Sequence, residues 1–92
     1  MKLHYEMGIT RAEFLRLLPA AVGHAPFRIE RDEIQGDGTP SWRIALREMP
    51  KRRIALVELP VLDVELVIDA PSGTEAKAFI DRFLLGFQRA GG

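Results

Sequence analysis

The sequence contains no cysteine, and only one tryptophan and one tyrosine occur among its 92 residues. The absence of cysteine excludes a disulfide scaffold, a cysteine-ligated zinc or iron–sulfur site and a thiol nucleophile. A net charge is also lacking, because thirteen basic residues balance thirteen acidic ones. The chain therefore lacks the basic footprint of nucleic-acid or anionic-membrane binding. No apolar run could span a bilayer and no signal-peptide pattern opens the chain, so we expect a cytoplasmic protein with no membrane partner and no nucleic-acid partner.

What the sequence does contain is typical of a globular domain, with 47% apolar and 28% charged residues. A folded chain of this mass exposes about 5,400 Å² and buries about 64% of its unfolded surface, which is enough for one modest core. We expect residues 1–92 to form a single domain with a frayed tail at 90–92.

Two capping boxes predict two helices. Thr10 precedes Glu13 by three residues, and Ser72 precedes Glu75 by the same interval. Pro19 would remove a hydrogen bond inside the first helix, so a kink or a separate short turn is expected there. Apolar stripes at helical spacing follow both caps: Phe14, Leu15, Leu18 and Val22 in the first helix, and Ala76, Phe79, Ile80, Phe83, Leu84 and Phe87 in the second.

Alternation of apolar and polar residues predicts five strands, over residues 2–7, 27–34, 42–47, 53–59 and 62–69. The glycine-rich segment 35–40 and the pairs Pro50-Lys51 and Pro60-Val61 predict the turns between the last four. Such short connections join only antiparallel neighbours. The expected class is α+β with the order β-α-β-β-β-β-α: a five-stranded, mostly antiparallel sheet with two helices on one face.

The order of elements resembles the TATA-binding-protein-like arrangement and, more loosely, the helix-grip folds. The resemblance covers the whole chain but rests on element order rather than on a motif. It therefore implies an architecture and no activity.

Pairing around the two proline turns predicts a register for the sheet. It places Trp42, Ile44, Leu46 and Val57 on the face that the helices cover. The other face, called the open face below, is expected to meet solvent.

Charged side chains alternate across the predicted open face. Arg43 is expected opposite Glu58, and Glu58 opposite Asp63, with Glu65 nearby and His4 joining if the first strand pairs with the fifth. Such a polar ladder of cross-strand pairs fixes register. Its carboxylates and His4 could instead form a cation or acid–base site, but Arg43 would neutralise it. We expect no metal site and no stabilisation by added divalent cations.

An apolar strip lies beside this ladder in the predicted register. It consists of Ala45 facing Leu56 and Ile54 facing Val67. A contiguous apolar strip on an otherwise solvated face is typical of a partner surface, and a symmetric homodimer is the commonest way to bury one. The leading hypothesis is a non-enzymatic binding or assembly module that homodimerises through the open face of its sheet.

Two other functions stay open. One is a small-molecule-binding protein or enzyme that uses a cavity between the curved sheet and the helices. The other, more remote, is a carrier whose C-terminal Gly91-Gly92 resembles the diglycine tails of ubiquitin-like and sulfur-carrier proteins. No serine has a histidine in local register, and Gly36-Asp37-Gly38 has no helix N-terminus behind it. We therefore name no catalytic residue and no cofactor.

Overall fold

Five strands and two helices make up the structure, a computed structural model that describes the backbone of residues 1–91 and the side chains of residues 1–88. The strands form one sheet in the order β1-β5-β4-β3-β2, and every neighbouring pair is antiparallel. The predicted α+β class and element order are confirmed. The last residue of the expected frayed tail lies outside the described residues. The elements are β1 (Lys2–Met7), α1 (Arg11–Ala21), β2 (Arg28–Glu30), β3 (Glu33–Gly36), β4 (Ser41–Ile54), β5 (Val57–Asp69) and α2 (Gly73–Gly91).

Both helices begin where the capping boxes predict. The Thr10 side chain accepts a hydrogen bond from the Glu13 amide at 3.1 Å, and the Ser72 side chain accepts one from the Glu75 amide at 3.2 Å. No separate turn forms at Pro19, because α1 continues through it to Ala21. Pro19 stands in the last turn of α1, where it removes one intrahelical hydrogen bond only.

The predicted strand over residues 27–34 is in fact a hairpin, β2 and β3, with its turn at Arg31-Asp32. Arg31 has φ 57°, which breaks the strand although no glycine marks the position. Contacts from distant residues hold this turn. Arg11 donates from Nη2 to the Arg31 carbonyl at 2.6 Å, and the Leu46 amide donates to the Asp32 carbonyl at 2.8 Å.

The turns expected at Pro50 and Pro60 are wrong. β4 continues through Pro50 and β5 through Pro60, and the two strands are joined at Ala55-Leu56, where Ala55 has φ 54°. The register shifts between Met49 and Arg52. The two prolines therefore sit in a β-bulge, the place where a strand tolerates a residue with no amide hydrogen. The sequence predicts one strand where β2 and β3 form a hairpin, and three strands where β4 and β5 form two. The two differences offset each other, so the number of strands is still five.

The register on the covered face changes accordingly. Trp42 lies opposite Ile68, not opposite Leu59 as expected. Val57, expected in the core, is 55% exposed. Trp42 itself is buried as predicted.

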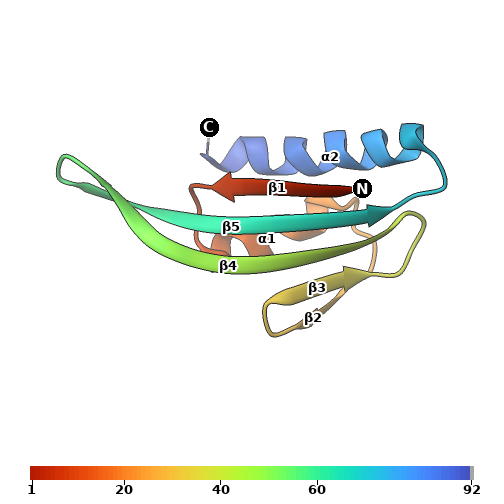
Figure 1. Ribbon diagram of the computed structural model, residues 1–92, viewed down its shortest axis with the longest axis horizontal. Helices are drawn as coiled ribbons and strands as arrows, with labels where there is room; N and C mark the ends of the chain where they lie inside the picture. The colour runs from red at the N-terminus through yellow and green to blue at the C-terminus, as the bar shows by residue number, and fades with distance from the viewer. Residues whose placement is uncertain (92) are drawn as a thin grey trace.

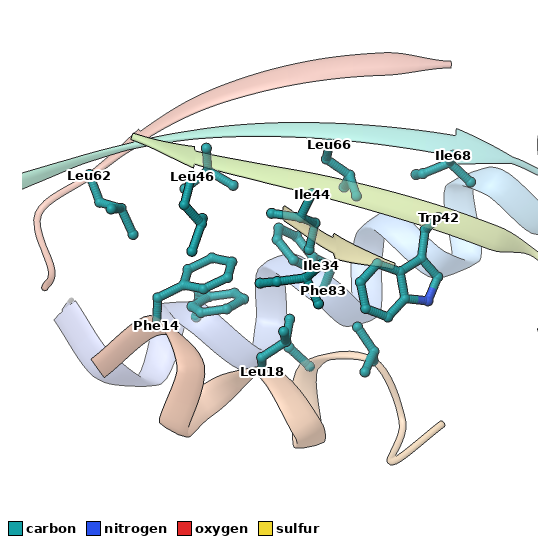
Figure 2. Close-up of a cluster of buried hydrophobic side chains, with 14 of the residues drawn as sticks. Phe14, Leu18, Ile34, Trp42, Ile44, Leu46, Leu62, Leu66, Ile68 and Phe83 are labelled. Carbon is teal, nitrogen blue, oxygen red and sulfur yellow. The ribbon is translucent and has the colours of Figure 1, made fainter. Parts of the chain in front are cut away.

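The core lies between the sheet and the two helices (Figure 2). Aromatic rings fill its centre: the ring centroids of Phe14 and Phe87 lie 4.6 Å apart, and those of Phe83 and Phe87 lie 4.9 Å apart. The buried apolar side chains are Phe14, Leu18, Ala21, Val22, Ile34, Trp42, Ile44, Leu46, Leu62, Val64, Leu66, Ile68, Ala76, Phe83 and Phe87.

The helices approach each other closely at Gly86. A Cβ atom there would lie 2.6 Å from the Cβ and 2.7 Å from the Cα of Ala21. Backbone atoms of a packed helix cannot withdraw cheaply, so only glycine fits this crossing.

Gly86→Ala should therefore destabilise the fold. Overpacking costs about 1–3 kcal/mol, whereas alanine gains roughly 1 kcal/mol over glycine in a helix, so the net loss should be up to about 2 kcal/mol. Urea denaturation measures it, with Gly73→Ala as the matched control, because nothing lies within 4 Å of a Cβ at Gly73. A gain in stability for Gly86→Ala equal to that of Gly73→Ala would contradict the close crossing.

Candidate functional site

The far ends of β4 and β5 project beyond the rest of the sheet (Figure 1). β1 pairs with β5 no further than Leu62, and β3 pairs with β4 only up to Ala45. Among the described strands, residues 49–61 therefore pair only with each other. We call this hairpin the arm, and the remainder of the described chain the body.

One side of the arm is apolar apart from Arg52, which pairs with Leu59. Met49 pairs with Val61, Ile54 pairs with Val57, and Leu59 lies between them on β5. Alternation along β5 places Val57, Leu59 and Val61 on the side of the ribbon that continues the open face. Ile54, Val57 and Leu59 are 56%, 55% and 40% exposed. These five residues are called the arm stripe below.

The arm gives the protein an extended shape and a large surface. The Cα atoms span 46 × 25 × 21 Å with a radius of gyration of 13.5 Å, against about 12.3 Å for a compact chain of this length. The accessible surface is 6196 Å², about 800 Å² more than a compact protein of this mass exposes.

The structure divides the predicted interface residues into two groups. Ala45 and Val67 lie on the open face of the body, where Ala45 pairs with Glu65 rather than with Leu56. Ile54 pairs with Val57 on the arm, not with Val67, and Leu56 is fully exposed at the tip. Nine residues of strand, about 30 Å, separate Ala45 from Ile54. The predicted strip is therefore not contiguous.

Three members of the predicted polar ladder come together on the open face of the body. β1 does pair with β5, which sets His4 beside Glu65 and brings its Nε2 into contact with the Asp63 carboxylate. Lys2 contacts the Glu65 carboxylate at 3.5 Å. Among the side chains that the structure describes, no three histidine, aspartate or glutamate residues form a group that could hold a metal ion.

The other two members lie elsewhere. Arg43 contacts Glu33 at 3.7 Å, and Glu58 accepts a hydrogen bond from Arg53 at 2.7 Å on the arm. The predicted pairs of Glu58 with Arg43 and with Asp63 are wrong, because the turn lies at Ala55-Leu56 rather than at the prolines.

An ion pair links the arm to β1. Arg52 donates to the Glu6 carboxylate at 2.6 Å across 46 residues of sequence. Both side chains are more than half exposed, so the pair contributes no more than about 1 kcal/mol. It nevertheless sets the direction in which the Arg52 guanidinium points.

The space proposed for a small molecule, between the sheet and the helices, is occupied by the aromatic core (Figure 2). Grooves lie at the rim instead. One, of about 340 Å³, runs between β1 and the end of α2 and includes Tyr5, Met7, Leu84 and Phe87. Partial burial raises the pKa of the Tyr5 phenol, so Tyr5 stays neutral at physiological pH and supplies no charge for a ligand.

The sequence pattern does not predict the arm, because the exposed residues of the arm alternate in the same way as the buried residues of a strand. A usable signal was present: Pro50 and Pro60 lie almost symmetrically about Ala55-Leu56. Two prolines that oppose each other in a bulge require a turn midway between them.

No protein-family model, no curated protein and no solved structure matches this chain. Neither described helix is long and apolar enough to cross a membrane.

Replacing Glu6 by Gln should loosen the arm without unfolding the body. Loss of an exposed ion pair of at most about 1 kcal/mol predicts amide exchange up to fivefold faster in residues 51–54 and 57–59. Hydrogen–deuterium exchange at dilute protein concentration measures this. Asp81→Asn is the control, because it removes an ion pair of 2.7 Å with Lys77 on α2. Equal arm exchange in both variants would contradict the anchoring role of Glu6.

Proposed function

We propose that this chain is a non-enzymatic assembly module that binds a second copy of itself through the arm. The observation that carries the proposal is the arm stripe: a row of large apolar side chains on a projecting hairpin, of which Ile54, Val57 and Leu59 are 40–56% exposed. The stripe lies on the side of β4 and β5 that continues the open face, which is the side expected from the sequence to mediate dimerisation.

Energetics support a partner. A two-stranded hairpin is marginally stable in water unless it packs against something. Burying a large aliphatic side chain completely contributes about 1.5–3 kcal/mol. In the isolated chain Leu56 forgoes all of this, Ile54 and Val57 about half and Leu59 less than half. The surplus surface of the monomer, about 800 Å², includes both sides of the arm and is comparable with what one partner contributes to a standard interface.

Charge supports a second copy rather than a nucleic acid. Of the three consecutive cations on the arm, Arg52 is paired with Glu6 and Arg53 with Glu58. Because most of the basic charge is neutralised within the chain, the arm lacks the set of free cations that phosphate contacts need. With no net charge, two copies approach each other without long-range repulsion.

Val57→Asp should dissociate the dimer and leave the body folded. A carboxylate placed in a desolvated apolar contact weakens self-association by at least 2 kcal/mol, or about thirtyfold in Kd. Leu85→Asp is the matched control, because Leu85 is 54% exposed on α2, nearly the same as Val57 on the arm. Sedimentation equilibrium at tens of micromolar measures association, and circular dichroism checks the fold.

A wild-type chain that stays monomeric at 100 µM would overturn the proposal. So would equal dimerisation of the Val57→Asp variant and the Leu85→Asp control.

A further inference from the structure

We infer that the two arms pack face to face and antiparallel, stripe on stripe, with the two-fold axis crossing β5 at Leu59. The inference rests on the proposed self-association and specifies which residues meet. Three features lead to it: the side of the arm on which the apolar residues lie, the ion pairs on the open face of the body, and the spacing of the arm stripe along β5.

Face packing is favoured over edge pairing. A free edge recruits another strand through unpaired amides, and proline and cations suppress this. Here Pro50 and Lys51 lie on the β4 edge of the arm and Pro60 on the β5 edge. The apolar surface lies instead on the flat of the ribbon, and two such surfaces pack about 10 Å apart.

The charges of the body decide the direction of the axis. An axis parallel to the strands would press one open face onto the other and bury the ion pairs of Lys2 with Glu65 and of Arg43 with Glu33. Desolvating such pairs costs more than their attraction returns unless their geometry is excellent. An axis perpendicular to the strands places the bodies at opposite ends, so that only the arms overlap.

The spacing of the stripe decides where the axis crosses. With the axis at Leu59, Val57 lies over Val61 of the second copy, and Ile54 over Met49 of the second copy, so apolar side chains meet apolar ones. Moving the axis by two residues to Val61 would lay Leu59 over Asp63 and Val57 over Glu65. Those carboxylates are already engaged in ion pairs on the body, so they would be desolvated without gaining a partner.

Arg52 pairs with Leu59 in the sheet, so two copies of Arg52 would approach each other at this axis. Each is bonded to Glu6 of its own chain at 2.6 Å, which draws the guanidinium towards β1 and neutralises it. The perpendicular axis therefore desolvates the Arg52–Glu6 pair, whereas the parallel axis would desolvate this pair and the ion pairs of the body as well. Of the predicted interface, Ile54 belongs to this contact, whereas Ala45 and Val67 stay outside it.

The arrangement has a defined length. The tip extends about three residues, or about 10 Å, past Leu59, so each copy of 46 Å reaches about 36 Å from the axis. The dimer should therefore be about 70 Å long rather than a compact pair. Small-angle X-ray scattering distinguishes this rod from two bodies packed side by side.

Cysteine cross-linking gives the direct test, since the chain has no cysteine of its own. Facing strands about 10 Å apart are too distant for a direct disulfide. A short thiol-specific bifunctional cross-linker is therefore used, which links a residue to its own copy only where that residue lies near the two-fold axis. With this reagent, Leu59→Cys should form a covalent dimer within minutes. The controls Val67→Cys and Leu85→Cys should cross-link only at the rate of random collision. Mixing the Val57→Cys and Val61→Cys variants should give the heterodimeric cross-link in preference to either homodimer.

The outcomes separate the two proposals. A dimer in which Val61→Cys or Val67→Cys cross-links to itself while Leu59→Cys does not would overturn the position of the axis and leave self-association intact. Absence of all cross-links in a chain that sediments as a monomer would overturn both. Sedimentation of Leu59→Cys without the cross-linker tests whether this variant still associates, so that a missing cross-link in an associating variant counts against the geometry.

Discussion

The rest of the structure depends on the pairing of β4 with β5. These strands have 14 and 13 residues, whereas β1 has 6 and β3 has 4. Where the shorter strands and the helices flank them, β4 and β5 form the centre of the sheet and bury Ile44 and Leu66 completely. Where the flanking elements end, the same two strands continue as an arm. One ladder of hydrogen bonds thus carries both the core and the exposed stripe.

Because β4 and β5 are longer than the strands that flank them, the protein has two surfaces of different chemistry. On the body, the open face is occupied by ion pairs that each close within the chain, such as Lys2 with Glu65 and Arg43 with Glu33. On the arm, the same side of the ribbon is aliphatic apart from Arg52, which is bonded to Glu6. A face whose charges are already paired gains little from a partner, whereas an uncovered aliphatic face gains from any surface that excludes water. The arm is therefore the part of the described chain best suited to assembly.

The candidate site was only partly accessible from the sequence. The sequence predicts Ile54 and Leu56 on a solvent-facing surface, and both are exposed, but on the arm rather than in a strip with Ala45 and Val67. The alternating pattern predicts Val57 in the core, whereas it is more than half exposed. Alternation states which residues share a face of a strand. It does not state whether another layer covers that face, which depends on how far the neighbouring elements reach.

By itself, the sequence determined the features that depend on nearby residues: the caps at Thr10 and Ser72, the helical stripes, and the order of strands and helices. Tertiary structure alone decided where the strands turn. Arg31 adopts a positive φ in a turn held by Arg11, a residue 20 positions away. Pro50 stays within a strand because no third strand requires its missing amide hydrogen. In both cases the deciding contact, or its absence, involves segments that come together only in the folded chain.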